Sequence, residues 1–379
     1  MSEVARFGRA TPRGLPRSGG WVAALGLSLL GIAGCPQPAA NDPATPFLDQ
    51  DGNFDFDRAT ALAIDDDAFA FSGTISGDND IDVFKLVTLQ PGDRLIVDVE
   101  RTSGNLDPVA AVFDSTQRLI AYNDDRTPDG SNRNPRIDFI LPGDAARELF
   151  LGIVTYPDSG STGNYVVDLT IERNVGKPVV DGQIVYLDFR GGSNIDIPNV
   201  GVFNLPSFNA ADLGTPFTGQ SGAIKAIIEA EVRERYQGYN LTLLNSDTAA
   251  KPSGPHSTVY FGSINERAFA IAEQIDTLNQ DESDDAIVFT QSFNDSFSVI
   301  PSTQEMGIAL GNTAAHEIGH LLGLVHTEDC AELMDATCGN DRILSKQFFG
   351  NSQLDDFVFP IGTQDAALLL EWVLGIAGL

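Results

Sequence analysis

One short segment constrains this chain more than any other. Residues 316–326 read His-Glu-Ile-Gly-His-Leu-Leu-Gly-Leu-Val-His and hold three of the four histidines in the 379-residue chain. On a helix, His316 and His320 would stack on one face, where two imidazoles can bind one zinc ion. That helix must end before His326 if the third ring is to reach the same ion, and Gly323 can end it. Three protein ligands with one open position are typical of a catalytic zinc site.

A carboxylate adjoins the first of these histidines. Glu317 is expected beside the open coordination position rather than as a ligand. In zinc hydrolases such a carboxylate takes a proton from the attacking water, whose pKa zinc lowers to about 7. We therefore predict Glu317 as the general base. The alternative is a chance H-E-x-x-H with histidines packed in a core, and the added glycine and third histidine argue against it.

A helix start precedes the motif. Ser302 and Glu305 have the spacing of a capping box. The sequence therefore predicts a buried central helix over residues 303–322. Its apolar surface would be supplied by Met306, Ala309, Leu310, Ala314, Ile318, Leu321 and Leu322.

With the downstream sequence included, the motif resembles that of the metzincin metallopeptidases, and within them the matrixins. Thr327 follows the third histidine, and Met334 stands where the family has a methionine in a tight turn below the metal. The resemblance implies three zinc-binding histidines, a catalytic glutamate, Met334 as the Met-turn and a peptide substrate. An isolated methionine would otherwise fill a core.

Two features depart from the matrixin pattern. Many matrixins bind a second, structural zinc through several histidines, but only His256 remains here, so we expect that site to be absent and His256 to lie at the surface. Matrixins also block their zinc with an upstream cysteine. The only upstream cysteine is Cys35, which belongs to a different motif.

The first 34 residues predict a lipoprotein signal peptide. Four arginines precede a short apolar stretch at residues 21–33, and residues 32–35 read Ile-Ala-Gly-Cys. This end resembles a bacterial lipobox, which implies cleavage before Cys35, lipidation of its thiol and attachment to the cell envelope. Pro36 replaces the aspartate that retains some lipoproteins in the inner membrane, so we expect the outer membrane or cell surface. The alternative is a buried apolar segment with an incidental cysteine.

Two further cysteines bracket Met334. In an oxidising compartment, Cys330 and Cys338 are expected to form a disulfide around the Met-turn. A second zinc site and two free thiols are the alternatives.

Charge limits the partners. The formal net charge of −30 argues against nucleic acid and against electrostatic attachment to anionic lipid, so membrane contact would come through the lipid anchor alone. Calcium is a weaker expectation. It rests on acidic loops that could equally be solvated turns or a polar linker, namely Asp49, Asp51, Asn53 and Asp55, and Asp78, Asp80 and Asp82. The oligomeric state is not indicated.

The rest of the chain predicts two domains. Residues 35–57 are expected to form an acidic, proline-rich tether, and residues 58–173 show the alternation and turn residues of an all-β sandwich. The sandwich segment resembles pre-peptidase C-terminal domains at residues 77–84, 90–93 and 163–165. Residues 174–182 would link it to an α+β, metzincin-like catalytic domain over 183–379, with a mixed sheet, zinc helix, Met-turn and C-terminal helix.

The catalytic domain has a predicted order of elements. We expect strands at 184–189, 241–244, 258–261 and 286–290, a cleft-edge strand at 269–274, and helices at 221–237 and 364–374, with Ser221 capping the first helix. The sequence as a whole predicts a lipid-anchored bacterial zinc endopeptidase. The alternative is a surface adhesin or carbohydrate-binding lipoprotein whose metal site is structural or inactive.

Overall fold

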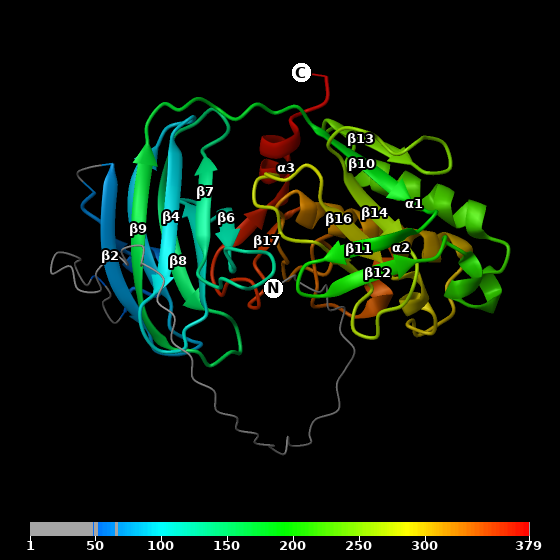
Figure 1. The fold of residues 1–379 in the computed structure, drawn as a ribbon, viewed down its shortest axis with the longest axis horizontal. Helices are drawn as coiled ribbons and strands as arrows, with labels where there is room; N and C mark the ends of the chain where they lie inside the picture. The colour runs from blue at the N-terminus through cyan, green and yellow to red at the C-terminus, as the bar shows by residue number, and fades with distance from the viewer. Residues whose placement is uncertain (1–47, 49–51, 65–66, 379) are drawn as a thin grey trace, which may run out of the picture.

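The computed structural model describes residues 48, 52–64 and 67–378, which form two halves that lie side by side (Figure 1). One half is a β-sandwich, and the other is a mixed sheet with helices. The predicted signal peptide, Cys35 and most of the predicted tether lie outside the described residues. Over the part of the chain that is described, no helix has the length and apolar character to cross a membrane.

The first half consists of two sheets packed face to face. One has the strand order β1-β3-β8-β5-β6, and the other has the order β2-β9-β4-β7. All pairings are antiparallel except the short β1–β3 pair. The bounds are β1 Thr60–Ala61, β2 Ala68–Ile75, β3 Asp82–Leu89, β4 Arg94–Arg101, β5 Pro108–Asp114, β6 Leu119–Asn123, β7 Arg136–Ile140, β8 Arg147–Thr155 and β9 Gly163–Glu172.

Alternation along the strands builds the sandwich core. In β9, Tyr165, Val167 and Leu169 are buried while their neighbours face outward, as a sheet with one covered face requires. The strands β5 and β8 are buried on both sides instead, because β5 is buried throughout and β8 nearly so. The second face of that sheet meets the other half of the protein.

The packed region begins before residue 58, although the tether was predicted to extend through residue 57. The backbone carbonyl of Asn53 accepts from the N–H of Val83 at 2.9 Å. The ring of Phe56, in the 3-10 turn η1 (Phe56–Arg58), packs edge-on against Phe113 and Phe150. The segment from residue 53 is therefore part of the sandwich.

Of the aspartates considered for calcium, Asp49 and Asp51 lie outside the described residues, and Asp78, Asp80 and Asp82 bond to the sandwich itself. Asp78 accepts from the backbone of Gly160, Asp80 accepts from Ser76, and buried Asp82 accepts from the hydroxyl of Tyr165 at 2.6 Å. They form no group with metal-binding geometry among the described residues. Their carboxylates stabilise turns, and calcium gains no support.

The second half is built on a five-stranded sheet of order β13-β10-β14-β16-β15. The first four strands are parallel, and only β15 runs antiparallel, at the edge. The predicted strands all appear within a residue or two, including the cleft-edge strand. The bounds are β10 Gln183–Asp188, β13 Leu241–Asn245, β14 Ser257–Phe261, β15 Ala270–Ala272 and β16 Asp285–Val288.

Two helices, α1 (Ser221–Arg235) and α2 (Thr303–Leu321), pack against each other beside this sheet. The approach is close because α2 has glycines at its contact points. A Cβ at Gly307 would lie 2.6 Å from Ile227, and one at Gly311 would lie 2.6 Å from Glu231. The capping box predicted for α2 is confirmed, since Ser302 and Glu305 bond reciprocally. The helix is buried from Met306 onward except at Ile308.

Three local predictions were wrong or missing. Ser221 is the first helical residue of α1 rather than its cap, because its hydroxyl accepts from Ala210. The helix ends at Arg235, two residues early. Two hairpins were not predicted, and the bounds of their strands are β11 Gly192–Ile197, β12 Gly201–Leu205, β17 Asn351–Gln353 and β18 Thr363–Asp365.

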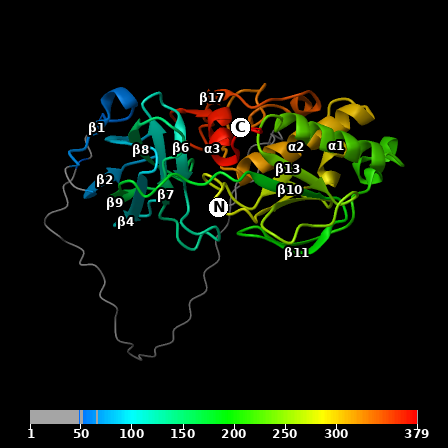
Figure 2. The ribbon, with the colours of Figure 1, turned by 90° about the horizontal axis from the view of Figure 1, so that it is seen from above.

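The halves share an apolar interface. Phe113 and Val154 of the sandwich belong to the same buried cluster as Val325, Leu354 and Phe359 of the second half. The C-terminal helix α3 (Ala366–Leu374) lies between the halves in both views (Figures 1 and 2). Its Trp372 lies under the guanidinium of Arg147 at 4.7 Å and beside Gly143 of the sandwich. The two halves therefore pack as one body.

A buried ion pair within α1 also bonds to α2, the helix that carries two of the histidines. Arg235, whose side chain is 0% exposed, pairs with Glu231 at 2.6 Å and donates to Asn312 of α2. Replacing Arg235 by Met would leave a buried carboxylate without its partner, which costs about 3–5 kcal/mol. We expect that loss in urea unfolding. Arg235→Met/Glu231→Met should recover part of it, and Arg233→Met, in the exposed i,i+4 pair with Glu229, should lose under about 1 kcal/mol.

Candidate metal centre

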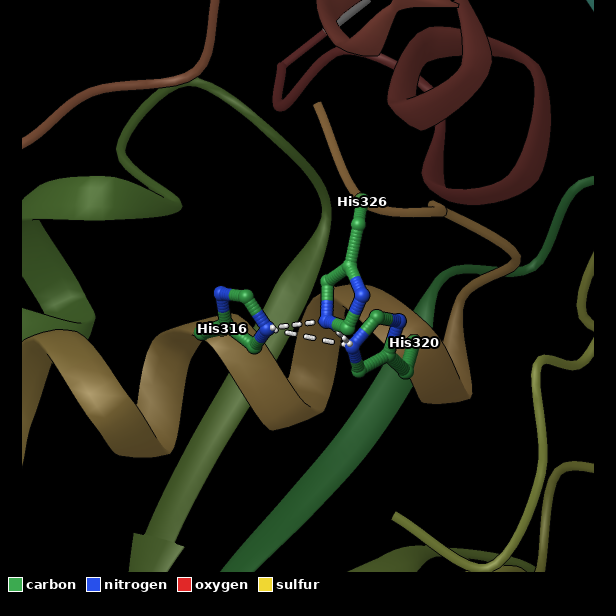
Figure 3. Close-up of side chains that lie close together, drawn as sticks. All are labelled: His316, His320 and His326. Carbon is green, nitrogen blue, oxygen red and sulfur yellow. Dashed lines mark hydrogen bonds between the residues drawn. The ribbon is translucent and has the colours of Figure 1, made fainter. Parts of the chain in front are cut away.

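Three imidazole nitrogens converge in the interior of the second half. His316 and His320 lie one turn apart on α2, and His326 reaches them from the segment after the helix (Figure 3). Their Nε2 atoms are 3.1 Å apart for His316–His320 and His320–His326, and 3.2 Å for His316–His326. All three side chains are buried. The structure thus brings together the three residues that the sequence singled out as ligands.

The donor set fits a tetrahedral cation. Nitrogens about 2.0–2.1 Å from one such ion would lie about 3.3 Å from one another, close to the separations here. The Nδ1 atoms of His316 and His320 contact the backbone carbonyls of Leu333 and Leu324 at 2.7 and 2.8 Å, so each Nδ1 carries the proton. Their Nε2 atoms then hold lone pairs and cannot donate to each other. A cation between them removes the repulsion.

Burial favours the neutral imidazole that a metal ligand requires. It lowers the pKa of His316 to about 3 from 6.5, and the charge of His326 acts in the same direction. The backbone carbonyl of Leu333 acts in the opposite direction and fixes the ring orientation. Contacts of this kind are common behind metal-binding histidines, where they select the tautomer.

The turn after α2 explains how His326 returns to the helix. Gly323 has φ of 90°, and the bonds Gly323 N–H to His320 O (2.9 Å) and Leu324 N–H to Gly319 O (2.8 Å) form a Schellman motif. The helix therefore ends where the sequence predicted, through the residue that the sequence indicated. The turn also leaves the carbonyl of Leu324 beside Nδ1 of His320.

Met334 packs against α2 at Gly319, a residue that lies between the two helical histidines in the sequence. A Cβ at Gly319 would come within 2.7 Å of its Sδ, so only glycine leaves the methionine room. The preceding residue, Leu333, holds His316, and the carbonyl of Met334 accepts from Thr327 at 3.0 Å. The methionine segment thus supports the first ligand and the segment of the third.

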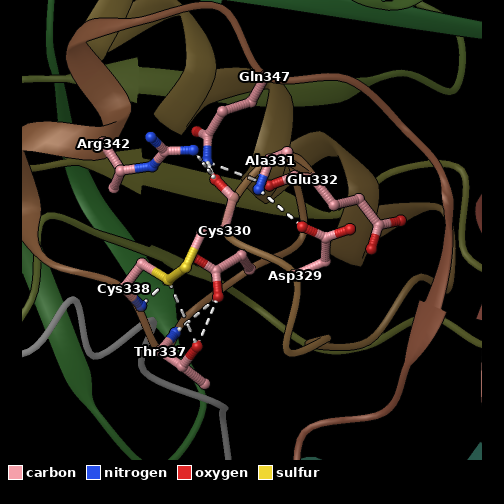
Figure 4. Close-up of a disulfide and its surroundings, with 9 residues drawn as sticks. Asp329, Cys330, Ala331, Glu332, Thr337, Cys338, Arg342 and Gln347 are labelled. Atoms are coloured by element: carbon pink, nitrogen blue, oxygen red, sulfur yellow. Dashed lines mark hydrogen bonds between the residues drawn. A yellow bond between two sulfur atoms is a disulfide. The ribbon is translucent and has the colours of Figure 1, made fainter.

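The cysteines around this turn form a disulfide, Cys330–Cys338 (Figure 4). Its sulfurs are therefore not available as metal ligands, although Asp335 lies close to both. The carboxylate of Asp335 accepts from Thr337 and Cys338, and the carbonyl of Cys330 accepts from Arg342 at 3.2 Å. The disulfide closes the loop that contains Met334.

The remaining candidates are placed as follows. Glu317 is fully buried on α2, next to His316 in the chain. His256 is partly buried at the start of β14, where its Nδ1 lies 2.7 Å from the carbonyl of Gly254, and it is apart from the three converging histidines. The edge strand β15 packs against α2. Asp276, shortly after it, donates its backbone N–H to the carbonyl of His320 at 2.9 Å.

Two residues of the site were not identified from the sequence. Gln364 bonds the backbone next to His326. Buried Glu332 accepts from the hydroxyl of Thr327 at 2.6 Å and from the backbone of Gly350. Gln364 bonds the backbone of Val325, and Glu332 bonds Thr327, the residue after His326. No sequence motif marks either position. Gly319 was a variable position of the motif, but a glycine inside a buried helix is itself a signal of close approach.

The matrixin family model matches residues 257–349, which hold the three histidines, Glu317, Met334 and the disulfide. The match covers well under half of the chain. Together with the three converging imidazoles, it supports a zinc-dependent, metzincin-like peptidase domain in this part of the protein.

Similarity to solved structures is low. An archaemetzincin from Methanopyrus kandleri is 13% identical with a TM-score of 0.26, over 44% of this chain and 88% of that one. A zinc-dependent peptidase from Methanocorpusculum labreanum is 12% identical with a TM-score of 0.29, over 50% and 100%. The Aeromonas hydrophila lysozyme inhibitor PliG is 15% identical with a TM-score of 0.24, over 30% and 96%. No fold assignment rests on these scores. No curated protein is significantly similar to the chain.

Gly323 offers a test of the turn that returns His326. Alanine there would adopt an unfavourable positive φ, at about 1–2 kcal/mol, and its Cβ would meet the backbone of Asp276 and Leu278 at 2.8 Å. We expect Gly323→Ala to lose at least that much in urea unfolding and to bind zinc more weakly. Gly339→Ala is the control, because Gly339 has φ of −66° and open space around it. Equal stability of the two variants would contradict this account.

The disulfide offers a separate test. Opening so short a loop removes about 2–3 kcal/mol of constraint on the unfolded chain. Cys330→Ser/Cys338→Ser should therefore unfold at lower urea, and reductant should shift the wild type by a similar amount. A reductant shift that persists in the double variant would show that another group is responsible.

Proposed function

We propose that this protein is a zinc-dependent endopeptidase with Glu317 as its general base. The observation that carries the proposal is the convergence of three Nε2 atoms within 3.2 Å of one another, on and after the helix that also carries Glu317. The matrixin match over the same residues supports the peptidase assignment.

The chain supplies defined parts of such a reaction. A zinc ion held by the three histidines would lower the pKa of a coordinated water to about 7 and polarise a scissile carbonyl. Glu317 would take the proton of the attacking water and return it to the leaving amine. No acyl-enzyme would form, because water rather than a side chain is the nucleophile. The dry surroundings strengthen these electrostatic effects, because the histidines and Glu317 are buried.

A polypeptide substrate would bind as an added strand. Strand β15 is the edge of its sheet and packs against α2, so an extended peptide added to it would lie beside the helix that carries the histidines. A hollow follows directly after this strand. It is lined by Glu273, Gln274 and Ile275 on one side and by Tyr122, Asn123 and Tyr156 of the sandwich on the other. The sandwich would thus border the substrate-binding region.

The cellular placement belongs to the same proposal. We place the protein in the bacterial envelope, at the outer membrane or cell surface, attached through a lipid on Cys35. The lipobox-like end of the first 34 residues supports it, and the charge of −30 disfavours nucleic acid as a partner.

The experiment is cleavage of a peptide library followed by mass spectrometry. We expect wild-type cleavage to stop when a chelator removes zinc and to return when zinc is added. Glu317→Gln should keep stoichiometric zinc and lose about 10²–10⁴-fold in turnover, the usual contribution of a general base. His256→Ala is the matched control and should keep both zinc and activity, since His256 lies outside the cluster.

Two results would contradict the proposal. Full activity of Glu317→Gln would refute the assigned base. Binding of a glycan by a zinc-loaded wild type that cleaves no peptide would favour the adhesin or carbohydrate-binding alternative. The same cleavage data would define the sequence preference around the scissile bond.

A further inference from the structure

The third histidine differs from the other two in what holds its backbone. His316 and His320 belong to α2, whose own hydrogen bonds fix them. His326 lies in a segment that is neither helix nor strand. Buried backbone groups in such a segment must find partners elsewhere. Those partners decide how firmly the ring of His326 is aimed at the other two.

One side chain supplies both partners for the residue before His326. The amide of Gln364 accepts from the N–H of Val325 at 2.7 Å and donates to the carbonyl of Val325 at 2.9 Å. Gln364 and Val325 are both 0% exposed. A glutamine amide can make this pair of bonds because it carries an acceptor and donors side by side. It replaces the two ladder bonds that a neighbouring strand would have made.

Gln364 is fixed in turn by the sandwich. It lies in β18, and the preceding residue, Thr363, donates its N–H to the carbonyl of Gln117 in the β5–β6 turn at 2.9 Å. Thr363 also forms a parallel bridge with Arg118, whose guanidinium pairs with Asp365 at 3.2 Å. The residues on both sides of Gln364 are therefore bound to the first half of the protein.

Apolar packing supports the same connection. Phe113 of the sandwich lies against Gly362, where a Cβ would overlap its ring, and against Phe359 with ring centroids 5.4 Å apart. A Cβ at Gly152 of β8 would lie 2.6 Å from the ring of Phe359. The segment that leads to β18 thus has little freedom to move away from the sandwich.

We propose that Gln364 is a positioning residue for the third zinc ligand, and that the sandwich acts on the metal centre through it. The inference rests on zinc binding by the three histidines in the function proposed above. The path runs from Arg118 and Gln117 through Thr363–Asp365 to Gln364, then to Val325 and His326. The sandwich is a structural part of the metal site in this account, rather than a spacer between membrane and enzyme.

The first test is the zinc affinity of Gln364→Met in the full chain. Methionine has a similar volume but bonds neither the N–H nor the carbonyl of Val325. Competition with a chromogenic chelator should show zinc binding weakened about 10–100-fold, the range for groups that orient metal ligands. The visible spectrum of the Co²⁺-substituted protein should also change, because the third imidazole is less well oriented.

A matched control separates positioning from general loss of stability. Gln183 is also buried, and at the start of β10 its amide bonds the hydroxyl of Ser257, the carbonyl of Glu282 and the amide of Asn279, rather than the backbone beside His326. Gln183→Met should destabilise the fold to a similar degree, yet leave zinc affinity and the Co²⁺ spectrum unchanged. Equal loss of zinc affinity in both variants would overturn the positioning role.

The second test addresses the sandwich. Arg118→Met removes the ion pair with Asp365 and also the pair with buried Asp114, but Asp114 keeps its second partner, Arg147, at 2.6 Å, so the fold should persist. We expect zinc affinity to fall several-fold. Combined with Gln364→Met it should add nothing, because both substitutions break one path. Additive effects would show that Arg118 acts by another route, and wild-type affinity in Arg118→Met would overturn the role of the sandwich. If Gln364→Met does not fold, the zinc affinity of Arg118→Met alone still tests the role of the sandwich.

The peptidase function and the positioning role of Gln364 can be refuted separately. A wild type that binds zinc but cleaves no peptide would refute the peptidase while leaving the Gln364 result intact. A wild type that cleaves peptides, with Gln364→Met holding zinc within about twofold of its affinity, would refute the positioning role alone.

Discussion

Three lone pairs directed at one buried point repel each other unless a cation lies between them, and the surrounding structure must hold the rings in place. Each ring is supported from behind by a different segment. The carbonyl of Leu333 supports His316, the Schellman turn supports His320, and the backbone beside His326 is held by Gln364. The helix α2, the turn after it and the downstream β17–β18 hairpin form a frame that holds the three rings around that point.

The sequence predicted the parts of this frame that depend on local chemistry. The capping box at Ser302 and Glu305 and the end of the helix at Gly323 follow from residues within a few positions of each feature, whereas the role of Met334 was implied by the family resemblance. Such features have signatures because a cap, a positive φ or a ligand spacing restricts which residue types can occur.

Other parts depend on tertiary contacts that leave no local pattern. Gln364 lies in a three-residue strand, and its importance comes from a segment 39 residues earlier. Serine is common at helix caps, but the hydroxyl of Ser221 accepts from the backbone N–H of Ala210 in a neighbouring turn. The acidic turns suggested calcium, although their carboxylates already bond to the backbone and hydroxyls of the sandwich. For Gln364, Asp78 and Asp82 the partner lies far away in the sequence, which local patterns do not reveal.

The buried interface between the halves has a consequence for the linker, residues 174–182. Most of this linker is exposed, and Val179 is 83% exposed, so the linker is accessible to proteases. The halves are held together by Phe113, Phe359 and Trp372 and by the bonds to β18, none of which requires an intact peptide bond at the linker. A nick there would produce two fragments that stay associated, and so the three histidines would remain joined to the sandwich.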